Sequence, residues 1–341
     1  MRSTSITGLP TSPVHATRRA WLQYAASGLL AGSVGATRAQ DDAASLTGPQ
    51  MPYAAFDRLT AERIAVTGGS IRVAFGPGEF ALPRERITAY ARQSATSVVG
   101  YFGRFPARDT RLLIIGTSSG GRAVRSGTAF GYRGAAIRLV LAESVTAADL
   151  ERDWILVHEM SHLALPSVPR RHHWIEEGMA SYVEPLARAQ AGVLGVEPVW
   201  ASMLKGMPLG LPQAGDRGLD NTPTWGRTYW GGALFCLLAD VEMRERSGNA
   251  KGLQHALRAI MDHGNMETDS PLDPLLRIGD AAVGLPVLTE LYARMKDDPY
   301  PVDLDALWQR LGVRLAGQDV TFDDAAPLAA VRRALTAPYA G

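Results

Sequence analysis

The chain has 341 residues, 46% of them hydrophobic and 20% charged, and its formal net charge is +1. This globular composition excludes collagen, coiled coil and wholesale disorder, and the lack of a basic excess argues against a nucleic-acid partner. Cys236 is the single cysteine, which excludes an intramolecular disulfide and any zinc or redox site built from cysteine pairs.

The first 39 residues have the layout of a bacterial export signal. They contain four arginines and no acidic residue, with a soft apolar stretch at 21–36 and small residues after it. Residues 17–23 (TRRAWLQ) resemble the twin-arginine motif, which directs the export of folded proteins. A retained membrane anchor is the alternative, although the glycines and serines of the stretch make a poor spanning helix. We therefore predict a periplasmic or secreted protein with no stable membrane anchor once residues 1–39 are removed.

The next part of the chain is predicted to be rich in strands. Residues 40–52 have the composition of a flexible lead-in, and residues 117–135 form a glycine-rich connection. Between and after them, four segments have the pattern of regular elements: two short strands at 64–80, a helix at 83–102, and buried strands at 111–116 and 136–142.

From residue 146 onward the pattern is mostly helical. A long segment rich in glycine and proline, 205–227, interrupts it. Further helices are predicted at 252–262, 287–295 and 304–311. A strand-rich front followed by a helical back predicts the α+β class.

Residues 158–162 read HEMSH, an HExxH motif inside a helix predicted at 146–166. His158 and His162 would lie on one helix face, so that both imidazoles can bind one zinc ion while Glu159 reaches the water that the ion activates. Composition alone predicts roughly 0.006 such motifs in the chain. The helix is apolar all round and should be buried, where these side chains are costly without a partner. Two core histidines bonded to the backbone are the alternative.

A zinc site needs a third protein ligand, which a second predicted helix can supply. Residues 174–182 read WIEEGMASY, and 14 residues separate His162 from Glu177. Glu177 lies on the face opposite the apolar stripe of this helix. A solvated face is the alternative, but beside HExxH a carboxylate on an antiparallel helix is what zinc requires. Gly178 would let these two helices approach closely.

HExxH followed by W-x-x-E-G-x-A-x-Y resembles the gluzincin metallopeptidases, and most closely the alanyl and glycyl aminopeptidase families. The resemblance covers about residues 150–250. It implies an α+β fold with a zincin, thermolysin-like catalytic domain, a small mixed β-sheet in front and a helical C-terminal subdomain. It also implies one Zn²⁺ ion held by His158, His162 and Glu177, with Glu159 as the general base. The implied organisation is an export signal (1–39), a lead-in (40–52), the catalytic domain (53–249) and the helical subdomain (250–341).

A second segment of the same families is partly present. Residues 229–234 read YWGGAL, which resembles the pattern Y-x-K-G-A-L with Gly231 in place of the lysine. The resemblance implies that the Tyr229 hydroxyl stabilises the oxyanion of the tetrahedral intermediate. An aromatic residue that packs on the core at a helix start is the alternative.

One expected element is missing. Alanyl aminopeptidases carry G-x-M-E-N on an edge strand before HExxH, and its acid helps to hold the free amino end of a substrate. The corresponding region here, 127–136 (GTAFGYRGAA), contains no acid, so the resemblance does not imply aminopeptidase activity. We expect the strand at 137–141 to pair with the substrate backbone and Trp225 to contact the substrate. We also expect His172 and His173 to be exposed.

The resulting hypothesis is a zinc metallopeptidase whose partner is a peptide or protein substrate. Two alternatives stay open. The first is a non-catalytic protein of the same fold that uses zinc for structure or peptide binding, against which the presence of Glu159 argues. The second is a zinc amidase that acts on a cell-envelope amide through the same chemistry. The sequence predicts no particular oligomeric state and does not separate exo- from endopeptidase.

Overall fold

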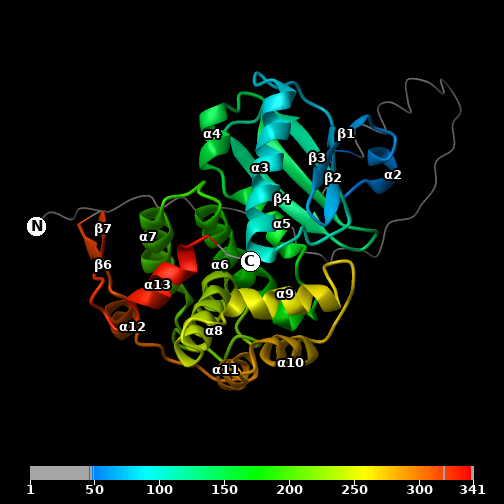
Figure 1. Ribbon diagram of the computed structural model, residues 1–341. Helices are drawn as coiled ribbons and strands as arrows, with labels where there is room; N and C mark the ends of the chain where they lie inside the picture. The colour runs from blue at the N-terminus through cyan, green and yellow to red at the C-terminus, as the bar shows by residue number, and fades with distance from the viewer. Residues whose placement is uncertain (1–45, 47, 49, 318, 339–341) are drawn as a thin grey trace, which may run out of the picture.

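The computed structural model describes residues 46, 48, 50–317 and 319–338 (Figure 1). The predicted export signal at 1–39 and most of the predicted lead-in at 40–52 lie outside the described residues. Within the described ranges, every helix is too short or too polar to cross a membrane.

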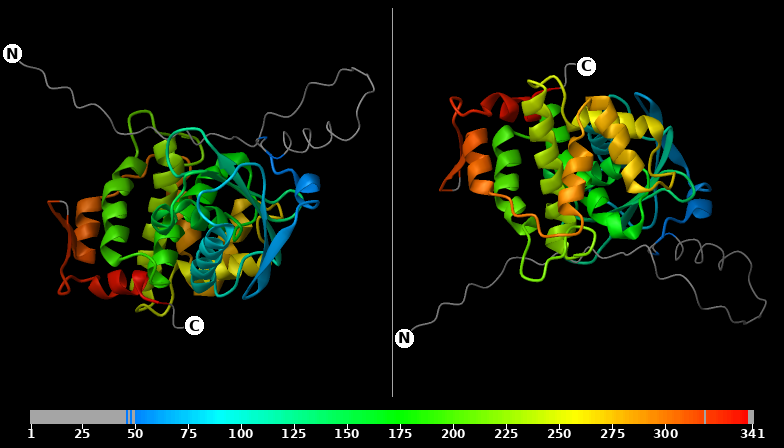
Figure 2. Two further views of the ribbon diagram at one scale, coloured as in Figure 1. Left: turned by 90° about the horizontal axis from the view of Figure 1, so that it is seen from above. Right: turned by 90° about the horizontal axis from the view of Figure 1, so that it is seen from below.

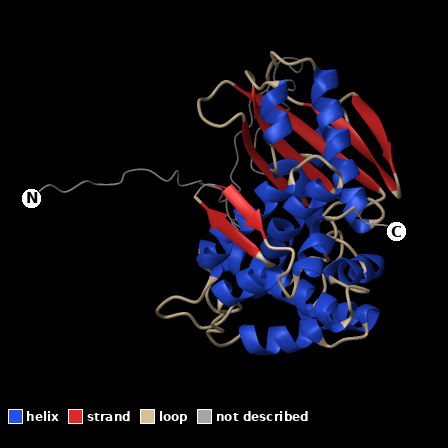
Figure 3. Ribbon diagram, turned by 60° about the vertical axis from the view of Figure 1, so that its left-hand side comes forward, coloured by secondary structure: helices blue, strands red, loops and turns tan. Residues whose placement is uncertain are grey.

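The front of the molecule is a five-stranded mixed sheet, as predicted (Figure 3). Its strands lie in the order β1-β2-β3-β5-β4. Neighbours are antiparallel in the pairs β1–β2 and β4–β5 and parallel in β2–β3 and β3–β5. The strands are β1 (Ala61–Val66), β2 (Gly69–Phe75), β3 (Asp109–Thr117), β4 (Val124–Phe130) and β5 (Ala136–Ala142).

Both faces of the sheet are covered. Helix α3 (Arg84–Phe102) packs on one face, where alternate side chains of the strands join the main apolar core. The short helix α2 (Tyr53–Phe56) lies on the other face, over a second cluster that includes Leu113 and Ile115. The central strands are apolar on both sides because both sides are buried, which is why their sequence predicted buried strands.

The glycine-rich connection predicted at 117–135 contains a strand, β4, that the sequence pattern did not indicate. The sequence of β4, VRSGTAF, has a glycine and few β-branched residues, so it carries a weak strand signal. β4 also takes the edge position that we expected for 137–141, because β5 is paired on both sides, with β3 and β4. Among the described strands, β4 is therefore the edge of the sheet on this side, and β1 is the opposite edge.

The helix predicted at 146–166 is two helices, α4 (Ala147–Arg152) and α5 (Ile155–His162). Asp153 adopts an extended conformation between them, with ψ of 145°. Its buried carboxylate accepts a hydrogen bond from the Leu156 N–H at 3.2 Å and another from the Tyr90 hydroxyl. Asp153 thus satisfies a free N–H at the start of α5, which explains the break.

The back of the molecule is helical, and one apolar core runs from the sheet into it. The predictions at 252–262, 287–295 and 304–311 are confirmed as α9, α11 and α12, whereas α10 and the hairpin β6–β7 were not predicted. Figure 2 places this hairpin at the opposite end of the fold from β1 and β2. The elements are α6 (His173–Gln190), α7 (Val196–Gly206), the π-helix η3 (Arg227–Gly231), α8 (Gly232–Arg246), α9 (Leu253–His263), α10 (Leu272–Val283), α11 (Val287–Met295), α12 (Leu304–Leu311), β6 (Val313–Ala316), β7 (Asp319–Phe322) and α13 (Ala329–Thr336).

Gly178 allows a close approach of helices, but not of the predicted pair. A Cβ atom on Gly178 would lie 2.2 Å from the carbonyl carbon of Gly232, and a Cβ on Gly232 would lie 2.0 Å from the Trp174 carbonyl oxygen. The helix that comes close to α6 here is therefore α8, not α5. The prediction of the contact is right and the prediction of its partner is wrong.

Candidate metal centre

Three potential metal ligands converge from two neighbouring helices. His158 and His162 lie one turn apart on α5, and Glu177 lies in the first half of α6, which packs against α5. The Nε2 atoms of His158 and His162 are 3.2 Å apart. Glu177 Oε2 is 3.4 Å from the first of these atoms and 3.6 Å from the second. The structure brings together the three residues that the sequence analysis predicts as ligands.

The distances between the three ligand atoms match those in a tetrahedral zinc site. Tetrahedral zinc with bonds of about 2.0–2.1 Å holds its ligand atoms about 3.3 Å apart. The three observed separations, 3.2, 3.4 and 3.6 Å, lie around this value. Two imidazole nitrogens and one carboxylate oxygen, with a fourth position left for water or substrate, form a donor set that catalytic zinc sites use.

The electrostatics of the cluster match this role. Burial raises the pKa of Glu177, but His162 and the other histidines around it outweigh this effect and hold the pKa well below its usual value. Burial lowers the pKa of His162, and Glu177 outweighs this and raises it. These opposite shifts favour the charged forms of both side chains, and where His162 is protonated, metal binding releases that proton.

Glu159 lies on the same helix and faces the edge strand of the sheet. It is buried, which raises the pKa of its carboxyl group, while the charges of His162 and His158 partly oppose this effect. The backbone of Ala129 in β4 also lowers the pKa of this carboxyl group and so opposes the effect of burial. A Cβ atom on Gly127 would lie 2.4 Å from Cγ of Glu159. The glycine of β4 thus provides the space in which Glu159 packs, and β4 fixes its position beside the predicted ligands.

Tyr229 approaches the cluster from the side of α8. It lies in the π-helix η3. Such turns are rare in proteins, and those that occur are often found at functional sites. Burial, together with the charges of Glu177 and Glu159, raises the pKa of Tyr229. Arg227 anchors the turn, because its buried Nε lies 2.8 Å from Asp216 Oδ2. The hydroxyl therefore stays protonated next to both carboxylates.

The prediction that His172 is exposed is wrong, because its side chain is buried. His172 Nδ1 lies 3.0 Å from Asp220 Oδ1. Trp174 Nε1 donates to the same oxygen at 2.8 Å, and the Tyr292 hydroxyl donates to Asp220 Oδ2 at 2.7 Å. Asp220 thus ties the long segment before η3 and helix α11 to the start of α6, the helix that carries Glu177.

His173 is half-exposed and contacts a predicted ligand. Its Nε2 lies 3.3 Å from Glu177 Oε1, and its Nδ1 lies 3.0 Å from Glu176 Oε2. Hydrogen bonds to Glu176 and Glu177 raise the pKa of His173 to about 9. Glu177 therefore faces the α5 histidines with one oxygen and His173 with the other. Sequence reasoning missed this contact, although the spacing of four residues on a helix signals it.

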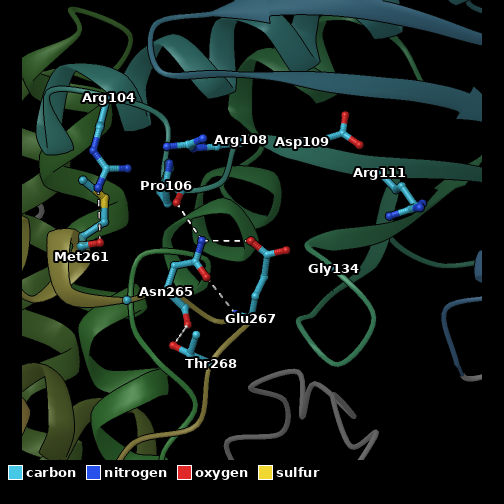
Figure 4. A pocket seen from close by; sticks show the side chains of 11 residues that line it. Arg104, Pro106, Arg108, Asp109, Arg111, Gly134, Met261, Asn265, Glu267 and Thr268 are labelled. Atoms are coloured by element: carbon cyan, nitrogen blue, oxygen red, sulfur yellow. Dashed lines mark hydrogen bonds between the residues drawn. The ribbon is translucent and has the colours of Figure 1, made fainter.

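A separate open hollow of about 500 Å³ lies between the sheet and the helical half (Figure 4). Asn265 lines the hollow, and its side-chain amide donates a hydrogen bond to the Pro106 carbonyl at 3.0 Å. Two of its arginines are paired with acids, Arg104 with Asp262 and Arg111 with Asp57. None of the five predicted site residues lines the hollow, so the metal centre is a different part of the surface.

No protein-family model matches the sequence, and no curated protein matches it either. The fold is similar to that of an aminopeptidase N family protein from Idiomarina loihiensis, with a TM-score of 0.55 and 16% identity, over 75% of this chain and 49% of that chain. An M1 zinc metallopeptidase from Deinococcus radiodurans gives a TM-score of 0.43 and 16% identity, over 72% of this chain and 54% of that chain. The chain therefore spans about half the length of these proteins. The first likeness shows a shared fold.

Proposed function

We propose that this protein is a zinc metallopeptidase that hydrolyses peptide bonds. One observation carries the proposal: His158, His162 and Glu177 converge at tetrahedral spacing while Glu159 lies buried beside them. The shared fold with an aminopeptidase N family protein supports it. In this proposal the sheet and the helices around the centre form a zincin, thermolysin-like catalytic domain that holds one Zn²⁺ ion.

When bound, a zinc ion polarises the substrate carbonyl and lowers the pKa of a water molecule from about 15.7 to about 7. Glu159 is placed to accept a proton from the attacking water at its carboxylate. Burial raises the pKa of Glu159 and so makes it a better proton acceptor. As the water oxygen bonds to the carbonyl carbon and the C–N bond breaks, this proton passes from Glu159 to the leaving nitrogen. The products are a free carboxylate and a free amine.

Tyr229 contributes a neutral hydrogen-bond donor. Its pKa is raised, so the hydroxyl keeps its proton at neutral pH and can donate it to the substrate oxygen as negative charge develops there.

The position of Glu159 argues against a non-catalytic zinc protein. A structural zinc site needs its ligands but no general base, and here Gly127 of β4 leaves the space in which the buried carboxylate of Glu159 packs. Burying such a group without a role is costly. A zinc amidase would use the same residues, and the choice of substrates in the test below separates it from a peptidase.

The test is to measure the zinc content and the cleavage of a mixed peptide library for the wild type and for Glu159→Gln. We expect both proteins to bind one zinc ion and the variant to lose at least about 100-fold in kcat. Glu151→Gln, an exposed change on α4, is the matched control and should cleave like the wild type. If both proteins bind zinc and neither cleaves a peptide, the peptidase hypothesis is wrong. If the wild type cleaves only cell-envelope amides, the amidase hypothesis is favoured.

A further inference from the structure

Exposed tryptophans are concentrated at the metal centre. The described residues contain six tryptophans, and only Trp154 and Trp225 among them are exposed, by 38% and 53%. The edge of the Trp154 ring meets His158, with ring centroids 5.5 Å apart. Trp225 stacks on Tyr229 at 5.9 Å. Each exposed indole therefore touches a different residue of the proposed site.

The two indoles flank the centre from different sides. Trp154 lies directly before α5, and Trp225 lies in the segment before η3. Helix α6, which carries Glu177, packs against both α5 and η3. An extended peptide whose carbonyl reaches the zinc position would place one flanking side chain near each indole. An indole exposes a large apolar area, and a bulky apolar side chain gains most by covering it.

The charges around the centre do not suit a free amino end. An α-amino group has a pKa of about 7.7–8.0 and needs a carboxylate partner when it is charged. In the proposed mechanism Glu159 is the general base and Glu177 is a zinc ligand, so neither is available to an amino group. The carboxylate oxygens of Glu176 already accept hydrogen bonds from the Val168 N–H and from His173. On the Trp154 side there is a cation, because the Arg122 guanidinium lies 5.9 Å from the indole ring. Arg122 forms no ion pair with any described residue.

We propose that the centre cleaves bonds in the interior of an extended peptide and prefers bulky apolar side chains on both sides of the scissile bond, with Trp154 and Trp225 as the surfaces that receive them. This inference rests on the proposed function and specifies its substrate class. The free edge of β4, next to Glu159, is available to pair with the backbone of such a peptide.

The test uses three internally quenched peptides and the zinc-loaded full chain. Two peptides are blocked at both ends and carry either Phe or Ala on both sides of the central bond, and the third is the Phe peptide with a free amino end. We expect cleavage of both Phe peptides at an internal bond, and a kcat/KM at least about tenfold above that of the Ala peptide. Trp154→Ala and Trp225→Ala should each reduce this preference at least about threefold through KM.

A binding measurement separates recognition from chemistry. Glu159→Gln should bind the blocked Phe peptide without cutting it, and adding Trp225→Ala should weaken that binding by the same factor by which it raises KM. Leu315→Ala, an exposed apolar change on β6 far from the centre, is the control and should leave binding and preference unchanged. An unchanged Phe-to-Ala preference in both tryptophan variants would overturn the inference. If the protein only released single residues from free amino ends, the inference of internal cleavage would be wrong but the proposed peptidase function would remain. If it cleaved none of the peptides, both the inference and the proposed function would be wrong.

Discussion

The substitution Gly178→Ala probes how packing between helices holds the proposed ligand Glu177 in place. A Cβ atom at position 178 would lie 2.2 Å from the carbonyl carbon and 2.3 Å from the Cα atom of Gly232. Carbon atoms in contact are normally about 3.5 Å apart or more. Because the opposing atoms are backbone, no side chain can rotate away, and α6 and α8 have to separate by about 1.2 Å.

The cost can be estimated from this displacement. Overpacking of a tight core typically destabilises by about 1–3 kcal/mol, and a backbone clash of this size falls at the upper end. Alanine has a better helix propensity than glycine by about 1 kcal/mol. We therefore expect a net loss of about 2 kcal/mol in the free energy of unfolding. The same movement shifts Glu177, the adjacent residue, and metal–ligand distances tolerate only about 0.2 Å. Zinc affinity should fall at least about tenfold.

Gly100→Ala is the matched control for this change. Gly100 also lies inside a helix, α3, but a Cβ atom there would have no other atom within 4 Å. Alanine at this position should stabilise the protein by about 0.5–1 kcal/mol and leave zinc affinity unchanged. Urea unfolding of the metal-free protein and competition with a chelator measure the two quantities. A Gly178→Ala protein as stable as Gly100→Ala, with wild-type zinc affinity, would refute the reasoning.

Two further substitutions test single side chains of the centre. Tyr229→Phe should lower kcat about 10²–10³-fold and leave zinc content and KM nearly unchanged, because the lost hydrogen bond acts on charge that develops only during the reaction; a loss confined to KM would contradict this role. In the metal-free protein, Glu176 and Glu177 raise the pKa of His173 from 6.5 to about 9, so its charged form stabilises the fold fully below pH 6.5 and this contribution disappears as pH rises through 9. His173→Gln should therefore flatten the pH dependence of the urea midpoint between pH 6.5 and 9, and an unaltered pH dependence would contradict the contact.

The ligand cluster could be predicted because its geometry is local. Two histidines four residues apart share a helix face in any α-helix, and the pattern around Glu177 identified its face on the next helix. The helix break at Asp153 could not be predicted in this way. The Asp153 carboxylate, which accepts the Leu156 N–H there, is also held by a hydrogen bond from Tyr90, a residue 63 positions away in the sequence. Likewise, His172 is buried because Asp220, 48 positions later in the sequence, accepts its hydrogen bond. Neither loop has a periodic pattern from which this hydrogen bond could be predicted.

Strand β4 was missed for a different reason, which also explains how the centre is built. Strand propensity treats Gly127 as a breaker, whereas the fold uses it to make room for Glu159. Gly178 and Gly232 have the same role between α6 and α8. Two contacts near the proposed zinc position, between β4 and α5 and between α6 and α8, thus depend on glycine. Substitution of these glycines should consequently impair zinc affinity and kcat at lower cost to overall stability than substitution of core leucines, since the clash lies next to the proposed site residues.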